Sequence, residues 1–247
     1  MVRYDFLTPE QLRVDGRRPQ EIRPIECHSG DVVKGADGSA SISMGLTKAV
    51  AYVYGPRPLN KRFQNSSGEA VVCVEYRTAT FGAIDRRRKS KGDRQSLEKA
   101  VWLQRTFEEV ILTDQFPKSQ IEIFVEIIQQ DGSSVSAAIN AVTLALVNAG
   151  IPMKDMVASC TLGLVDRKFI LVDLNQSETE KGTGSAQICM ATYGRTGQIS
   201  LCEVESKIPV SSFHEALKVG TLSCSETIQI MRAHIAEYAE SRFANFQ

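Results

Sequence analysis

The sequence predicts a mixed α+β domain, on three observations. Short β-rich runs are separated by Gly, Pro and Asp turn signals, and helical patterns interrupt them at irregular intervals. Strict β-α-β alternation is absent, and no Gly-rich nucleotide-binding loop follows a predicted strand. The composition, 43% hydrophobic and 23% charged over 247 residues, is that of a globular protein with a substantial core.

Strands are expected where β-branched and aromatic residues cluster or alternate between turn signals. The expected strands span residues 39–43, 49–54, 70–76, 121–128, 157–164, 169–174, 186–193 and 199–205. Apolar periodicity and stop signals predict helices at 96–112, at 135–148 and from Ser211 or Ser212, as N-cap, to about Phe243. The apolar positions of the first helix are Leu97, Val101, Leu103, Phe107, Val110 and Ile111.

Charge and cysteine usage narrow the functional classes. The 29 Lys and Arg residues balance 29 Asp and Glu residues, and this neutral total neither indicates nor excludes a nucleic-acid surface, because local patches set the field. The six cysteines form no Cys-x-x-Cys pair and the three histidines have no finger-like spacing, so we expect reduced thiols, no metal and no cofactor. Cys160 and Cys189 lie in apolar runs without a neighbouring histidine, which favours core packing over nucleophilic catalysis.

Membrane insertion and secretion are not expected. No segment approaches the roughly 20 apolar residues that a membrane-spanning helix needs. Residues 1–6 lack the apolar stretch of a secretory signal peptide. We therefore expect a soluble intracellular protein without a membrane partner.

Several short motifs follow one another in an order and at spacings that resemble the RNase PH family. They include residues 12–18 (LRVDGRR), 36–40 (ADGSA), 54–56 (YGP), 117–121 (PKSQI), 130–132 (QDG) and 148–153 (NAGIPM). Each motif is weak alone, but their succession covers nearly the whole chain. The resemblance implies an RNase PH-like fold, similar to domain 2 of ribosomal protein S5. It implies one domain over residues 1–247, with βαβα-like halves at 1–150 and 151–247.

The family reaction that this resemblance implies is phosphorolysis, in which inorganic phosphate attacks the last phosphodiester of an RNA 3′ end and releases a nucleoside diphosphate. Family members also form the six-membered ring of the RNA exosome, whose channel takes single-stranded RNA. The resemblance therefore implies RNase PH-like ring neighbours, RNA-binding cap subunits and an associated hydrolytic 3′–5′ exoribonuclease. It further implies roles in ribosomal RNA maturation and messenger RNA turnover, in the nucleus, nucleolus and cytoplasm.

The residues that carry catalysis in active family members are replaced here. Active members place a Ser-Arg pair at the start of the helix after the long strand, where the helix N-terminus and the guanidinium bind phosphate. Ser134 matches the serine, but Val135 stands at the arginine position. Two aspartates of active members, six residues apart, correspond to Thr179 and Ser185, which do not ionise near neutral pH. The resemblance therefore indicates an inactive, structural subunit that guides RNA.

Two enzymatic alternatives stay open. The first is an active phosphate-dependent 3′–5′ exoribonuclease. In the second, Glu178 or Glu180 supplies the missing acid, which would need a local shift because neighbouring residues of an extended chain point to opposite faces. Asp131 is interpreted as a turn residue that caps the following helix rather than as a catalytic acid.

Basic residues stand where the family lines its RNA channel and its phosphate site. Arg62 matches a channel arginine, and Arg94 matches the first of two consecutive arginines, of which the second is Gln95 here. Guanidinium groups suit phosphodiester contacts, whereas composition alone would favour a solvated surface. The expected RNA contacts are Arg57, Lys61, Arg62, Arg94, Gln95 and Ser134. The basic run at 86–91 is interpreted as a surface linker with an auxiliary role in RNA contact or nuclear import.

Overall fold

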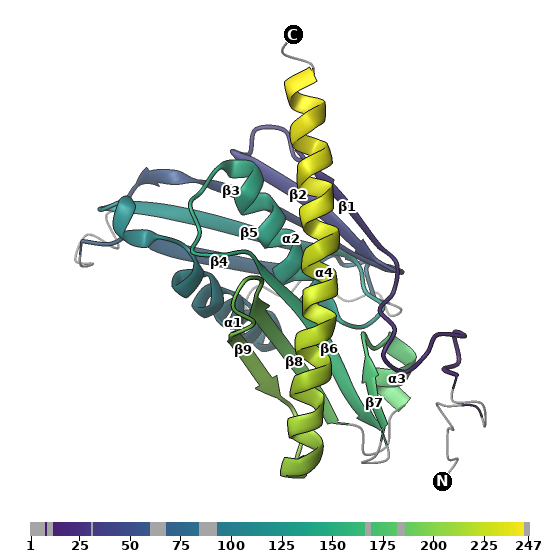
Figure 1. Cartoon of the computed structure of the whole chain (residues 1–247). Coiled ribbons are helices and arrows are strands. Elements are labelled where there is room, and N and C mark those ends of the chain that lie inside the picture. The colour runs from purple at the N-terminus through teal and green to yellow at the C-terminus, as the bar shows by residue number, and fades with distance from the viewer. Residues whose placement is uncertain are drawn as a thin grey trace.

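The chain forms two β-sheets with a helix between them, so the expected α+β class is confirmed (Figure 1). The structure is a computed structural model. It describes Thr8 and residues 12–30, 32–59, 68–83, 93–165, 169–181 and 186–244. Among the helices of these ranges, none combines the length and the apolar character that crossing a membrane requires.

The first sheet has five strands in the order β1-β2-β3-β5-β4. Its strands are β1 (Ile25–Ser29), β2 (Gly38–Met44), β3 (Thr47–Pro58), β4 (Val71–Thr78) and β5 (Ser119–Gln129). Only β4 and β5 are parallel, and helix α1 (Arg94–Val110) with the short 3₁₀ helix η2 (Thr113–Gln115) makes the crossover between them. Alternate residues of β2, β3 and β5 are buried, as expected for a sheet with one face on the core.

The parallel pair brings helix N-termini to one edge of this sheet. Because β4 and β5 run in the same direction, their carboxyl ends lie together, and α1 and helix α2 (Ser134–Ala149) each begin after one of these ends. The β2–β3 hairpin turns at the same edge, because Lys48 pairs with Gln129. We call this side the carboxyl edge. Open α/β sheets commonly bind ligands outside the carboxyl ends of their parallel strands.

The second sheet has four antiparallel strands in the order β7-β6-β8-β9. They are β6 (Val157–Val165), β7 (Phe169–Val172), β8 (Ala186–Tyr193) and β9 (Ile199–Val204). The short helix α3 (Gln176–Lys181) follows β7, and the 35-residue helix α4 (Val210–Ala244) follows β9.

Helix α2 packs against both sheets and is buried around its whole circumference from Ser134 to Leu146. Its small and apolar side chains suit this position, because a helix covered on all sides has no polar face. Three of its polar side chains, Ser136, Asn140 and Thr143, find partners in β6. Ser136 Oγ lies 2.7 Å from Thr161 Oγ1, and Asn140 Oδ1 accepts the N–H of Ser159 at 2.8 Å.

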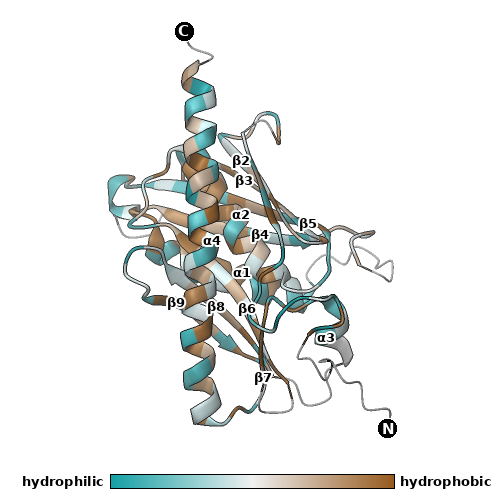
Figure 2. Ribbon diagram, turned by 45° about the vertical axis from the view of Figure 1, so that its right-hand side comes forward, coloured by the Kyte–Doolittle hydropathy of each residue, from teal (hydrophilic) through white to brown (hydrophobic). Residues whose placement is uncertain are grey.

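Strand β6 is buried on both faces, because α2 covers one face and α4 the other. On the α4 side, Cys160 Sγ lies 3.4 Å from Cys224 Sγ, and Cys189 is also buried. The expected core position of Cys160 and Cys189 is therefore confirmed. Figure 2 shows hydrophobic residues in α2 and the strands around it, and mixed hydropathy along α4.

Two elements were missing from the sequence prediction. Strand β1 (IECHS) contains charged and polar residues because it is an edge strand, of which no residue is fully buried. Helix α3 was not expected because residues 169–174 were interpreted as a strand that continued into an extended loop.

The first and last helices differ from the sequence pattern in detail. Of the apolar positions of α1, Leu97 and Val101 are 58% and 43% exposed, because α1 turns its Leu103–Phe107–Val110 face towards the sheet. The N-cap expected for α4 was wrong. Neither Ser211 nor Ser212 caps α4, which begins at Val210, and the carbonyl of Pro209 accepts the first helical hydrogen bond from Phe213 at 3.0 Å.

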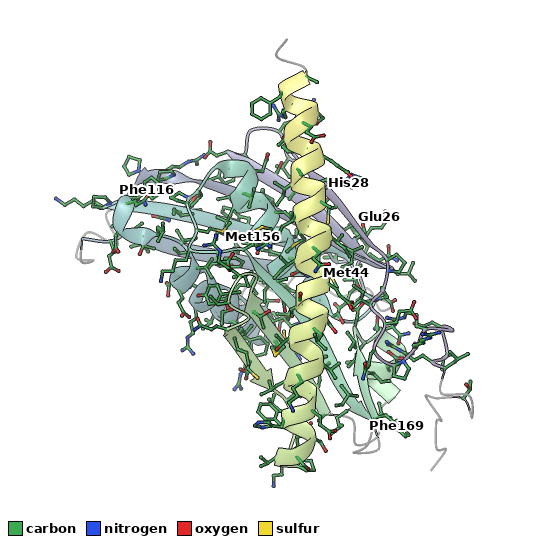
Figure 3. The ribbon with its side chains drawn as sticks, viewed as in Figure 1. Glu26, His28, Met44, Phe116, Met156 and Phe169 are labelled. Carbon is green, nitrogen blue, oxygen red and sulfur yellow. The ribbon has the colours of Figure 1, made fainter. Side chains whose placement is uncertain are left out.

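The distal half of α4 packs on β1 around a histidine pair, with His28 labelled in Figure 3. His234 Nε2 lies 3.1 Å from Ser29 Oγ. Burial lowers the pKa of His234, the nearby His28 lowers it further, and Glu237 acts in the opposite direction. Tyr238, one turn further on, covers Gly30, where an added Cβ would meet the Tyr238 ring.

This contact predicts a loss of stability in mild acid. The folded-state pKa of His234 lies below the unfolded value of about 6.5, so the unfolded chain takes up the proton first. The free energy of unfolding therefore has its full contribution from His234 above pH 6.5, and it loses this contribution as the pH falls towards the folded-state pKa. Urea unfolding at pH 7.5, 6.5 and 5.5 measures this slope. His234→Gln, which keeps a partner for Ser29 but does not titrate, should have a shallower slope, and an unchanged slope would contradict the assignment.

Candidate functional site

A tight turn between β5 and α2 forms the centre of the carboxyl edge. Gly132 has φ 75° and Ser133 has φ 47°, so two successive residues adopt the left-handed conformation just before α2. Ser133 Oγ donates to the carbonyl oxygen of Leu174 at 3.0 Å, and a Cβ at Gly132 would lie 2.2 Å from that oxygen. The turn therefore packs directly against the backbone that follows β7.

Thr47 at the start of β3 holds this turn from the other side. Its Oγ1 accepts the N–H of Asp131 at 3.1 Å and donates to the carbonyl of Gly132 at 2.8 Å. Thr47 is fully buried, so its hydroxyl has little competition from water. The turn is thus fixed by hydrogen bonds to both sheets.

The first turn of α2 presents N–H groups without partners inside the helix. Ser134 and Val135 begin this turn, and no side chain caps it. Such N–H groups and the helix dipole attract anions, above all phosphate. Val135, however, is 9% exposed and offers only methyl groups where an arginine would add a charge and a bidentate donor.

Asp131 does not cap α2, which corrects the interpretation from sequence. Because Gly132 and Ser133 reverse the chain, the Asp131 carboxylate turns towards the segment after β7. Its Oδ1 accepts the N–H of Gln176 at 3.2 Å, and its Oδ2 lies 3.4 Å from Arg23 Nη1. Asp131 therefore joins the turn to α3.

A buried ionic cluster lies behind the turn. Its members are Arg13, Arg17, Arg23, Asp131, Asp173 and Glu178. Arg23 donates from Nε and Nη2 to the two Asp173 oxygens, both at 2.7 Å, and from Nη1 to the Asp131 carbonyl at 2.7 Å. Burial alone would raise the pKa of Asp173, but the hydrogen bonds and charge of Arg23 outweigh it and hold that pKa below its usual value.

Glu178 belongs to the same cluster and forms a reciprocal cap on α3. Arg13, which is 1% exposed, donates from Nε to Glu178 Oε1 at 2.8 Å and pairs through Nη2 with Glu178 Oε2. Glu178 Oε2 also accepts the N–H of Asn175 at 3.0 Å, while Asn175 Oδ1 accepts the N–H of Glu178 at 3.1 Å. This Asn-x-x-Glu arrangement is a capping box, and it explains why residues 176–181 are helical.

Glu178 is therefore not free to act as an acid. The expected extended chain at this point was wrong, because α3 is a helix whose third residue is committed to Arg13. Thr179 is exposed, and its Oγ1 donates to the Asn175 carbonyl at 3.0 Å. The Glu180 side chain and Ser185 lie outside the described residues. Within the described ranges, no group of three or more His, Cys, Asp or Glu residues could hold a metal ion.

Arg94 and Gln95 lie at the N-terminus of α1, on the carboxyl edge with Ser134 and Val135. Arg94 is exposed and makes no ion pair with any residue that the structure describes. The topology therefore brings the predicted contacts Arg94, Gln95 and Ser134 to one edge, next to the positions expected to be catalytic in relatives.

Arg57 lies at the opposite end of the sheet. It pairs with Gln120 in the β3–β5 ladder, near the start of β5. Nine strand residues at ~3.3 Å each place it roughly 30 Å from the end of β5. Its guanidinium lies 4.5 Å from the centre of the Tyr54 ring and 3.6 Å from Asp37. Lys61 and Arg62, also predicted to contact RNA, lie outside the described residues, as does the basic run at 86–91.

Sequence reasoning missed several residues of the carboxyl edge. Arg13 lies in the motif at 12–18 but was given no role, and Arg23 was not singled out, although arginines spaced before the first strand could have suggested an ionic contact. Leu46 and Phe81 are 61% and 71% exposed, and Lys48, two residues after Leu46, is an exposed cation. Leu46 and Lys48 flank the start of β3, and Phe81 follows the end of β4.

Two domain models of one known protein family match this chain, and their boundaries agree with its division into two sheets. Residues 21–152 match the "3' exoribonuclease family, domain 1" of RNase PH, and residues 155–221 match its "domain 2". The first match covers the five-stranded sheet with α1 and α2, and the second covers the four-stranded sheet and the start of α4.

Three curated relatives from a plant, an animal and an archaeon match over nearly their whole length. The chain is 41% identical over 234 residues to "Exosome complex component RRP41 homolog" of Arabidopsis thaliana, covering 94% of this chain and 95% of that protein. It is 38% identical over 242 residues to human "Exosome complex component RRP41", covering 96% and 97%. It is 36% identical over 232 residues to the archaeal "Exosome complex component Rrp41" of Methanopyrus kandleri, covering 94% and 95%.

Solved structures support the fold. Rice (Oryza sativa) Rrp46 superposes with a TM-score of 0.80 at 23% identity, covering 91% of this chain and 100% of that one. A chain of the Archaeoglobus fulgidus exosome with RNA bound to the active site superposes with a TM-score of 0.74 at 20% identity, covering 89% and 92%. With both family domains matched and relatives above one-third identity along its length, the chain belongs to the RNase PH family of 3′ exoribonucleases.

Proposed function

We propose that this chain is a subunit of an RNA exosome ring that guides single-stranded RNA without catalysing its phosphorolysis. A hydrolytic 3′–5′ exoribonuclease associated with the ring would then cut the RNA, and cap subunits would bind it at the entrance. The proposal extends the names of the relatives, which are exosome components, to this chain.

The observation that carries the proposal is that the described residues of the carboxyl edge lack the charged groups that phosphorolysis needs. Phosphorolysis needs a cation beside the attacking phosphate and an ionisable group near the scissile bond. Val135 supplies no charge, Thr179 supplies only a hydroxyl, and Glu178 is bound to Arg13. The loss of one such electrostatic donor typically costs about 3 kcal/mol of transition-state stabilisation, and here several are missing together.

The same edge keeps what binding needs. The free N–H groups of α2, Ser134 and the exposed Arg94 can contact phosphodiesters, and none of these contacts depends on the base sequence. Binding of any RNA 3′ end is therefore retained, whereas cleavage is not.

An active phosphorolytic exoribonuclease is the second candidate. It is favoured by the α2 N-terminus and Arg94, which would suit inorganic phosphate as well as RNA phosphate. It requires a carboxylate from outside the described residues, such as Glu180, or from a neighbouring subunit.

Orthophosphate dependence separates the two candidates. The chain is co-expressed and assembled with RNase PH-like subunits of the proposed ring, and the assembly is incubated with a single-stranded RNA and millimolar orthophosphate. We expect RNA binding by fluorescence anisotropy and no release of nucleoside diphosphates. The binding measurement, made on the same preparation, shows that a lack of activity is not caused by misassembly.

The control variants are Thr179→Ala and Ser185→Ala in the same assembly. Phosphate-dependent release of nucleoside diphosphates that either change abolishes would overturn the proposal in favour of the active enzyme. Release of nucleoside monophosphates without phosphate, sensitive to Glu180→Gln, would instead support an acid from α3.

Cellular location follows from the same proposal. A ring that processes both ribosomal and messenger RNA works in the nucleus, the nucleolus and the cytoplasm. Imaging of the tagged chain, with and without the basic run at 86–91, tests this location and the import role of that run.

A further inference from the structure

We propose that Phe81 is a base-stacking residue of the carboxyl edge, on which one base of a bound RNA lies while its phosphate contacts the start of α2. The inference rests on the proposed function, since it names how the same edge holds RNA. It adds an apolar contact to a site otherwise described by charges and N–H groups.

Among the residues that the structure describes, none covers the Phe81 ring. Its side chain is 71% exposed, whereas Phe107 on the neighbouring helix α1 is fully buried. A large aromatic ring in water forfeits the stabilisation that burial would give. Leu46, on the β2–β3 hairpin of the same edge, is 61% exposed as well. Two large apolar side chains from two different turns thus face solvent at the carboxyl edge.

Phe81 is held on a fixed turn. The N–H of Ala79 donates to the Ile127 carbonyl at 2.9 Å, and the N–H of Gly82 donates to the Ala79 carbonyl at 3.0 Å. The Gly82 carbonyl accepts the N–H of Gln130 at 2.7 Å, and a Cβ at Gly82 would lie 2.7 Å from the Ile128 carbonyl oxygen. The ring therefore projects from a backbone that is already ordered, which lowers the entropic cost of binding.

The position of this turn links the ring to the phosphate-binding groups. Gln130, whose N–H donates to the Gly82 carbonyl, lies four residues before Ser134 at the start of α2. Arg94 begins α1 on the same edge, and Lys48 lies exposed across the sheet on β3. At this edge an apolar ring is combined with cations and helical N–H groups that have no partner among the residues the structure describes, and this combination matches a nucleotide, which joins a flat base to an anionic phosphate.

This combination favours RNA over a protein partner. A protein patch would offer apolar contact to Phe81 but would leave the cations and N–H groups at the edge without partners. A base also stacks on an aromatic ring whatever its identity, which agrees with binding of any sequence.

The test uses the assembled ring in phosphate-free buffer, so that it is independent of any phosphorolysis. An RNA carries 2-aminopurine at one of its last nucleotides, and its fluorescence is quenched when the base stacks. We expect quenching with the native ring and its loss with Phe81→Ala. Affinity should fall by about 5- to 150-fold, the range for one lost base–aromatic stack, and Phe81→Tyr should restore both readouts.

Phe243→Ala is the matched control, because Phe243 is 74% exposed near the end of α4, which projects away from the sheets (Figure 1). It should bind like the native ring. An RNA with an abasic site in place of the stacked base should bind native and Phe81→Ala rings equally.

Each contrary outcome has a separate meaning. A native ring that does not bind RNA overturns the proposed function itself. Native binding with no difference between Phe81→Ala and Phe243→Ala overturns the stacking assignment alone. Failure of Phe81→Ala to assemble, with unchanged RNA affinity in the fraction that does, would show that Phe81 contacts a protein neighbour and would also overturn it.

Discussion

Replacing Arg23 by Met should destabilise the chain by about 3–5 kcal/mol at neutral pH. The change leaves Asp173 buried with its main partner gone, and an unpaired buried carboxylate costs far more than a surface ion pair contributes. It also removes the donor to the Asp131 carbonyl that ties the β5–α2 turn to the first β-strand region. Urea unfolding of the purified chain measures the loss.

Arg18→Met is the control for this prediction, because Arg18 is exposed in the same segment and its side chain makes no contact that the structure describes. It should change the free energy of unfolding by less than about 0.5 kcal/mol. Adding Asp173→Asn to Arg23→Met should recover part of the loss, since it removes the uncompensated charge. Equal stability of Arg23→Met and Arg18→Met would refute a structural role for the ionic cluster.

Gly132→Ala should have an effect of similar size, at about 3 kcal/mol or more. The residue has φ 75°, which by itself costs roughly 1–2 kcal/mol for an L-residue. The new Cβ would also lie 2.2 Å from the backbone oxygen of Leu174, which cannot rotate away. The turn before α2 must therefore shift, and affinity of the assembled ring for RNA should fall together with stability.

Gly150→Ala separates these two contributions. Gly150 lies at the other end of α2 with φ 71°, but a Cβ there would have no heavy atom within 4 Å. Gly150→Ala should therefore lose only the stability that the positive φ costs an L-residue, and it should leave RNA affinity unchanged. If the two alanine variants were equally stable, the close contact with Leu174 would not matter.

Much of the fold could be predicted from local patterns. The two predicted internal helices and all the predicted strands exist, because apolar periodicity reports which face of an element is buried. Strand β1 was missed because an edge strand need not be apolar on either face. Periodicity identified Leu97 and Val101 as apolar positions of α1, but it could not say how wide the covered stripe of the helix is, and both are exposed.

The candidate site was predicted less completely. The family motifs identified Ser134 and Val135, and the topology brings them together with Arg94. The roles of Asp131 and Glu178 were not predictable, because each depends on an arginine more than 100 residues distant in sequence.

The sequence by itself determined which chemical groups the chain has: a valine, a threonine and a serine at the positions that the family resemblance matches to charged residues. It also determined the element types, because helix and strand periods are local properties. Only the tertiary structure decided that the acidic groups near the turn are neutralised by buried arginines and that Phe81 is left in water. Ion pairing and exposure depend on which segments distant in the sequence contact one another, and no local sequence pattern specifies those contacts.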